Sequence, residues 1–356
     1  MRPISAQFAR IAPVLRLTRV SSAFAAVANA WFVILWTRAT EQERAVLVAT
    51  GRELGPIWID LLAGAAAAAG LYAFGACLND VMDTTRDRAM RRDRPIAEGL
   101  VSPSAAVTVG AFSLIIATLG AVWFGQAAVV LTCALALAVL GFNTLGKFIP
   151  GFGLVLLALI YTGHMIVPNI QLRFLWPVLL VMTHALLVSG VAHVVGRRAP
   201  PLTPRAVFAA ILGWAFWAAV LAGLAAGRSG DAATPTDSGE AGGALVTEAT
   251  RGFGLDVLWP DWVGRAGPII VSVLAVVFIV VVVRRIRRLG MGPRTAEKIN
   301  RYGSLWLPVY ACGWLFGAGH TGEGAIMACL AVTGFLGMSA LREVYAAVEH
   351  PIGYRR

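Results

Sequence analysis

The sequence is poor in charge. Asp, Glu, Lys and Arg make up 14% of its 356 residues, and the only two lysines are Lys147 and Lys298. An average soluble domain is about 25% charged. Hydrophobic residues make up 58%, the mean hydropathy is +0.73, and no acidic residue occurs between Glu98 and Asp231. So little charge cannot cover a water-exposed surface, which excludes a soluble globular domain and indicates a membrane protein.

Cysteine is also scarce. The four cysteines all fall within apolar runs and show no paired spacing: Cys77, Cys133, Cys312 and Cys329. Cysteines of this kind behave as small buried apolar residues. The sequence therefore supports neither a disulfide framework nor a zinc site.

Long apolar runs fill most of the chain. A helix needs about 20 apolar residues to cross a bilayer core. Runs near that length lie at 15–36, 57–79, 103–123, 127–147, 151–169, 174–196, 205–226, 268–286, 305–319 and 323–347. They predict an all-α, polytopic transmembrane bundle of ten spans, or nine if the short ninth run merges with a neighbour. An Arg-bearing stretch without a small-residue cleavage site precedes the first run, so we expect no signal peptide.

The basic residues gather on one side of the expected membrane. If the N-terminus is cytoplasmic, only seven Lys and Arg residues lie outside: Arg38, Arg44, Arg52, Arg173, Arg228, Arg251 and Arg265. Cytoplasmic loops carry an excess of Lys and Arg. The sequence therefore predicts a multi-pass protein of the cell inner (plasma) membrane. The net charge of +11 then reflects orientation and attraction to anionic membrane lipid, and requires no nucleic acid as a partner.

Residues 1–356 are expected to form a single membrane domain with two notable loops. Segment 227–266 is rich in Gly, Ala, Ser, Thr and acidic residues, a composition typical of flexible chain. We expect it to be a flexible extracytoplasmic loop insertion. Segment 80–102 is expected to be a cytoplasmic loop that carries the chemistry.

The densest cluster of charge follows the second apolar run. Asp80, Asp83 and Asp87 are spaced i, i+3, i+7, so a helix would present them on one face. Mg²⁺ prefers a few carboxylates together with the oxygens of a phosphate ligand. Arg91 and Arg94 lie just downstream, and arginine forks match phosphate oxygens. The pattern predicts a magnesium-dependent diphosphate site.

Two stretches carry a resemblance to a known family. They read Asn79-Asp80-x-x-Asp83-x-x-x-Asp87 with Arg94-Pro95-Ile96-x-x-Gly99-x-x-Ser102, and Phe142-Asn143-x-x-x-Lys147. They resemble the UbiA family of intramembrane prenyltransferases, as Leu15-x-Leu17-Thr18-Arg19 does more weakly. The resemblance implies Mg²⁺-dependent prenyl transfer from a prenyl diphosphate to an aromatic or lipid acceptor within the membrane.

The resemblance also implies roles for individual residues. Asp80, Asp83 and Asp87 would hold Mg²⁺ and act in catalysis. The diphosphate would be bound by Asn79, Arg91, Arg94 and Lys147. Tyr161, with Tyr72 and Phe74, offers aromatic faces that can stabilise an allylic cation.

The chain departs from the family in one respect. Members commonly carry a second Asp-rich motif at the end of the sixth span, where this chain reads from Thr183 to Arg198 without an acidic residue. Either Arg197, Arg198 and Lys147 replace the charge of a second metal, or the activity has weakened. His193 lies where an acidic residue would be expected.

Several alternatives remain open at this point. A catalytically weakened member would bind an isoprenoid or act as a membrane partner protein. A CDP-alcohol phosphotransferase ranks lower because no Asp-Gly dipeptide precedes the motif. A transporter usually has charge near the bilayer midplane, where this chain has only histidines. His164 and His184 are interpreted as core residues that pair across helices.

Overall fold

The computed structural model describes residues 11–90, 94–230, 259–260 and 262–349, and this part of the chain contains helices and no strand. The helices are α2 (Val20–Ala39), α3 (Glu41–Ala49), α4 (Ile57–Met82), α5 (Thr84–Met90), α6 (Pro103–Val122), α7 (Gln126–Thr144), α8 (Pro150–Ile166), α9 (Trp176–Val195), α10 (Pro204–Gly230), α13 (Ala266–Leu289), α14 (Pro293–Gly317) and α15 (Thr321–Glu349), with a 3-10 turn η1 (Gly146–Phe148). The predicted all-α class is confirmed.

Eight of the described helices are long and apolar enough to cross a membrane. Each of the ten expected ranges contains a helix, but two do not meet this criterion. Helix α8 has only 17 residues. The ninth run is the second half of the 25-residue α14, whose first half carries Arg294, Glu297, Lys298 and Arg301. The boundary expected near residue 305 was wrong, because the helix continues through a polar stretch in which the apolar signal is lost.

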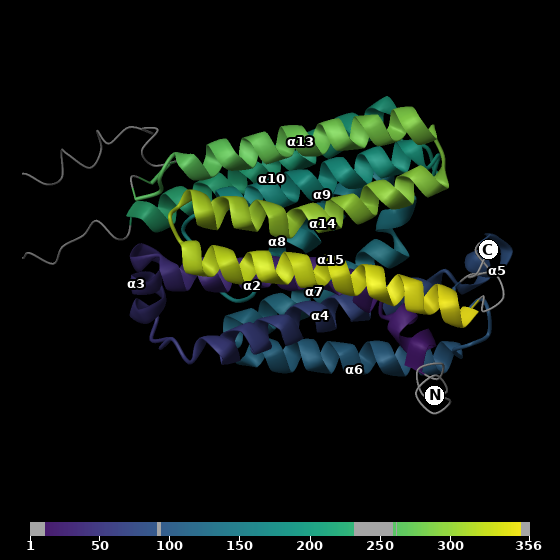
Figure 1. Ribbon diagram of the computed structural model, residues 1–356, viewed down its shortest axis with the longest axis horizontal. Coiled ribbons are helices and arrows are strands. Elements are labelled where there is room, and N and C mark those ends of the chain that lie inside the picture. Colours follow the sequence, from purple (N-terminus) through teal and green to yellow (C-terminus); the bar gives the residue numbers. More distant parts are fainter. Residues whose placement is uncertain (1–10, 91–93, 231–258, 261, 350–356) are drawn as a thin grey trace, which may run out of the picture.

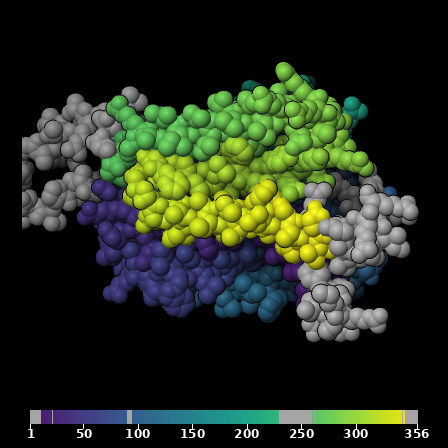
Figure 2. Space-filling view, in the orientation of Figure 1, coloured from purple at the N-terminus to yellow at the C-terminus, as the bar shows by residue number. Residues whose placement is uncertain are grey.

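The long helices run side by side along one axis (Figure 1). In this view α9, α10, α13 and α14 form the upper part, and α2, α4, α6 and α7 form the lower part. Helix α15 packs on both α2 and α14, and the space-filling view shows it across the front of the molecule (Figure 2). We call the end that holds α5 the aspartate end and the end that holds α3 the opposite end. Which end faces the cytoplasm stays a prediction of the basic-residue count.

Small residues let α4 and α6 pack very closely. A Cβ added to Gly70 would lie 2.6 Å from the backbone oxygen of Ser113, and one added to Gly120 would lie 2.6 Å from that of Ala63. Such an approach is possible only without side chains at those two positions. Helix α4 carries Asp80 in its last turn, so the contact with α6 also fixes the position of the helix that bears this aspartate.

We therefore expect Gly70→Val to destabilise the bundle by about 2 kcal/mol, because the new side chain must push two backbones apart. Thermal unfolding in detergent measures the change. Gly223→Val is the matched control, since a Cβ there meets nothing within 4 Å. Equal melting temperatures for the two variants would contradict the packing argument.

Two buried histidines bridge helices, as interpreted from the sequence. His164 Nε2 lies 3.0 Å from the backbone oxygen of Ala68, which joins α8 to α4. His184 Nε2 lies 3.0 Å from the backbone oxygen of Gly303, which joins α9 to α14. Both therefore act as cross-helix hydrogen-bonding groups of the core.

Most of the segment 227–266 lies outside the described residues. Its first residues belong to α10, which ends at Gly230. Near its end, Trp259 and Trp262 pack against Phe174 with ring centroids 5.5 and 6.0 Å away. The flexible loop therefore stays a prediction for residues 231–258, while Trp259 and Trp262 belong to the core at the opposite end.

Candidate functional site

The aspartates lie where one helix gives way to the next. Helix α4 ends at Met82, Asp83 is its C-cap, and α5 begins at Thr84. The Asp83 N–H donates to Asn79 O at 2.9 Å, and the Asp87 N–H donates to Asp83 O at 2.8 Å. Helical hydrogen bonding therefore passes through the junction. The expected single helix is interrupted at Asp83, because the backbone there leaves the regular α conformation.

Asp80 is almost fully buried and is held by basic side chains. Its Oδ1 accepts from Arg19 Nη2 at 2.7 Å, and from Arg94 Nη1 and Asn79 Nδ2 at 3.4 Å each. Its side chain is 1% exposed, whereas that of Arg19 is 32% exposed. Asp80 Oδ2 is buried and accepts no hydrogen bond in the described part of the chain. One oxygen of a buried carboxylate is thus available for a further partner.

Asp83 takes a separate cation. Lys147 Nζ donates to Asp83 Oδ1 at 2.6 Å. Both side chains are largely buried: that of Lys147 is 14% exposed and that of Asp83 is 18% exposed. Lys147 lies in η1, so the pair joins the end of α4 to the turn between α7 and α8. The sequence predicted Lys147 at the site, and the structure brings it into direct contact with an aspartate.

Arg19 is the site residue that the sequence analysis missed. It is the N-cap of α2 and adopts a left-handed backbone with φ 49°, which is uncommon for a residue other than glycine. Burial disfavours its charge, but the charge of Asp80 and their hydrogen bond outweigh this, so the pKa of Arg19 is raised. The only sequence signal was the weak match of Leu15-x-Leu17-Thr18-Arg19.

The sequence also placed Asp87, Arg91 and Tyr161 at the site. Asp87 is buried, at 7% exposure, and lies within electrostatic range of Arg19, as do Tyr72 and Tyr161. Arg91 lies outside the described residues. Tyr161 is part of α8 and packs against the hydrophobic core.

The end of α9 forms a local structure of its own. His193 Nε2 lies 2.8 Å from the backbone oxygen of Pro200, so the histidine is engaged within its own turn. Arg197 and Arg198 are exposed in that turn. Arg197 has no ion pair with Asp80 or Asp83 among the described residues.

The residues around Asp80 meet the requirements of magnesium only in part. Within the described ranges, no three His, Cys, Asp or Glu side chains lie together in a way that could hold a metal ion. Magnesium, however, is usually bound by one or two carboxylates plus substrate phosphates and water. Asp80 and Asp83 supply such carboxylates, and Asp80 Oδ2 has no competing donor. Among the described residues, the arrangement fits magnesium that arrives with a phosphate ligand and holds too few grouped ligands for a metal bound by protein alone.

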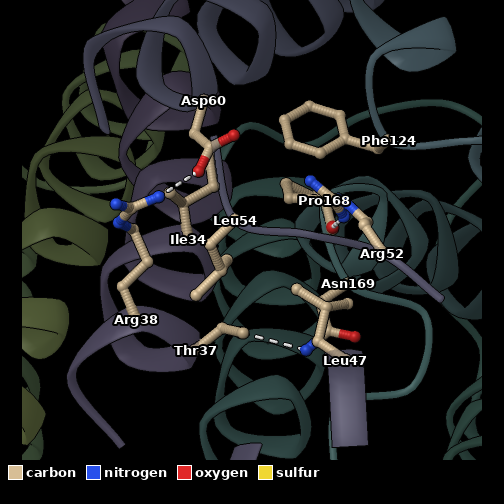
Figure 3. A pocket seen from close by; sticks show the side chains of 10 residues that line it. All are labelled: Ile34, Thr37, Arg38, Leu47, Arg52, Leu54, Asp60, Phe124, Pro168 and Asn169. Carbon is tan, nitrogen blue, oxygen red and sulfur yellow. Dashed lines mark hydrogen bonds and ion pairs between the residues drawn. The ribbon is translucent and has the colours of Figure 1, made fainter. Parts of the chain in front are cut away.

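A second buried polar cluster lies at the opposite end (Figure 3). Asp60, in the first turn of α4, is 2% exposed. Its Oδ2 accepts from Arg38 Nη1 at 2.6 Å, and its Oδ1 accepts from Trp123 Nε1 at 2.7 Å. Arg52 donates to Pro168 O at 2.7 Å and its guanidinium lies 4.7 Å from the centroid of the Phe124 ring. The lining residues leave a cavity of only about 10 Å³, which is too small for a ligand. The hydrogen bonds of the cluster therefore have a structural role, and they join α2, α4 and the end of α6.

Comparisons with known proteins leave the family open. No family model matches the chain, and no curated protein matches it. A solved structure of a digeranylgeranylglyceryl phosphate synthase in membranes is similar over 87% of this chain and 98% of its own, with 16% identity and a TM-score of 0.48. A likeness at that level carries no argument about family or activity. The functional argument therefore rests on the site itself.

Proposed function

We propose that this protein transfers a prenyl group from a prenyl diphosphate to an aromatic or lipid acceptor, with Mg²⁺, at the aspartate end of the bundle. The observation that supports it most is the grouping of two carboxylates with three cations. Asp80 lies against Arg19 and Arg94, and Asp83 lies against Lys147. A membrane bundle that gathers both signs of charge at one end suits a ligand with an anionic head and an apolar tail.

In this proposal the three cations bind the diphosphate. Arg19 and Arg94 present forked N–H donors, which match phosphate oxygens, and Lys147 adds a compact charge. Each now neutralises an aspartate, so a bound diphosphate competes with those carboxylates for the same donors. As the cations turn toward the diphosphate, Asp80 and Asp83 become free to ligate. Magnesium, when bound, would neutralise the charge on the diphosphate.

The proposed reaction begins when the bond between the allylic carbon and the diphosphate oxygen breaks. Its electron pair leaves with the diphosphate, whose growing charge the three cations stabilise. Tyr72 and Tyr161 lie within electrostatic range of Arg19, and their aromatic rings would stabilise the carbocation. The acceptor then donates an electron pair to the carbon, and its proton passes to the departing diphosphate.

A specific observation favours a second candidate, a weakened relative that binds an isoprenoid or serves as a membrane partner. The end of α9 carries no acidic residue, and His193 is engaged with Pro200. Formation of product from a labelled prenyl diphosphate separates the two candidates, because the second binds without turnover. A phosphotransferase or a transporter has no supporting observation in the described residues.

The geometry predicts that magnesium and diphosphate bind together. Geranylgeranyl diphosphate should bind the purified protein at least about tenfold more tightly with Mg²⁺ than with EDTA, because the carboxylates repel the diphosphate unless a cation intervenes. Magnesium alone should bind weakly, since the aspartates are already paired. Calorimetry on the protein in nanodiscs measures all three affinities.

The double variant Asp80→Asn/Asp83→Asn tests the assignment. It should lose the magnesium dependence and bind the diphosphate equally well with or without the metal. An unchanged magnesium dependence in the folded variant would show that these aspartates are structural here. Absence of binding in the wild-type protein would remove the diphosphate proposal altogether.

A further inference from the structure

Two groups of basic side chains at the aspartate end differ in their partners. In the first group each side chain forms an ion pair with a carboxylate: Arg16 with Glu98, Arg19 and Arg94 with Asp80, and Lys147 with Asp83. The second group follows the end of α9 and the turn between α13 and α14. Its members are exposed and form no ion pair with a carboxylate of the described residues: Arg197, Arg284, Arg287, Arg288, Arg294 and Lys298. We call these six residues the basic hairpin cluster.

The cluster belongs to one packed unit. A Cβ added to Gly196 would lie 3.0 Å from the Cβ of Ala296, so the last turn of α9 touches the first turns of α14. Arg285 donates to the Tyr302 hydroxyl, and its guanidinium lies 5.1 Å from the centroid of that ring. This contact fixes the end of α13 against α14. Three helix ends are therefore held together, and the basic side chains project from them.

The surface next to the cluster is apolar. Val276, Val280 and Val283 on α13 are 60%, 42% and 40% exposed, and Arg284 follows directly. In a bilayer this face of α13 meets acyl chains, while the arginines lie at the level of the headgroups. Within residues 284–301 the only acidic residue is Glu297. An apolar surface that ends in a cationic band matches a phospholipid with an anionic headgroup, whereas a soluble anion matches the cationic band alone.

We propose that the basic hairpin cluster is a binding site for an anionic phospholipid, with its phosphate among the arginines and its chains along α13. The orientation rule requires an excess of basic residues on one side. It does not require five of the six to lie on one packed hairpin with no carboxylate partner among the described residues. The proposal is independent of the prenyl-transfer activity, since none of the six residues contacts an aspartate of the site among the described residues.

Binding of fluorescent phosphatidylglycerol to the full-length protein in detergent micelles tests this. Each basic residue near a membrane surface changes affinity for anionic lipid by about fivefold, so Arg287→Gln/Arg288→Gln should weaken binding by about 30-fold. Both side chains are exposed, so the fold should tolerate the change. Arg44→Gln/Arg265→Gln removes two exposed arginines at the opposite end and should bind as the wild type does. Arg287→Lys/Arg288→Lys should retain most of the affinity.

Three outcomes would overturn the proposal. One is equal affinity in the wild type and the Arg287→Gln/Arg288→Gln variant. Another is displacement of the probe by phosphatidylcholine as efficiently as by unlabelled phosphatidylglycerol, which would show that only the apolar surface binds. The third is displacement by millimolar inorganic phosphate, which would identify a soluble anion as the ligand.

Discussion

Asp83→Asn should reduce prenyl transfer by at least about 100-fold, because it removes a carboxylate that would hold magnesium against the departing diphosphate. The protein should still fold. The side chains of Lys147 and Asp83 are only 14% and 18% exposed, so the variant leaves a largely buried lysine without its partner and should lose about 2 kcal/mol of stability without unfolding. Product formation from a labelled prenyl diphosphate, measured beside thermal unfolding, separates the effect on chemistry from the effect on folding.

Glu98→Gln is the matched control for this variant. Glu98 also pairs with a basic side chain at the aspartate end, with Arg16 Nη1 3.2 Å from Oε2, but the pair includes neither aspartate of the site. The control should retain wild-type turnover. Turnover within a few-fold of wild type in folded Asp83→Asn would rule out a catalytic role for this carboxylate.

The helices were predictable because membrane insertion depends on local properties. Length and hydropathy of a single run decide whether it can cross a bilayer, so each of the ten expected ranges contains a helix. The prediction failed where a helix did not match its apolar run. In α14 the helix begins at Pro293, before the apolar residues, and its charged first half gives no hydropathy signal that could locate this start.

The site was only partly predictable, because its members meet across long separations in sequence. Asp80 and Asp83 share a local motif, and Lys147 was expected from a second motif. Arg19 lies 61 residues from Asp80, and its role depends on an unusual backbone conformation at the start of α2. No periodicity reports such a contact. The spacing of the motif also did not indicate which side chains pair with the carboxylates. These partners differ between Asp80 and Asp83.

Asp60→Asn should lower the free energy of unfolding by about 2 kcal/mol. The change leaves the Arg38 charge beside a neutral amide in a largely buried position, and an uncompensated charge of this kind is strongly destabilising. The side chain of Arg38 is 22% exposed, so water relieves part of the cost. Trp123 Nε1 can still donate to the amide oxygen. Denaturant unfolding in mixed micelles measures the difference.

Because the cost comes from the orphaned charge, removing that charge should restore stability. The double variant Asp60→Asn/Arg38→Gln should recover at least half of the loss. Together with the single variant Arg38→Gln, this gives a coupling energy of at least about 1 kcal/mol. Activity per folded molecule should not change in either variant, since Asp60 lies in the first turn of α4 and Asp80 in its last. A double variant that loses the sum of both single effects would mean that the two residues stabilise the bundle separately, through packing and not through their charges.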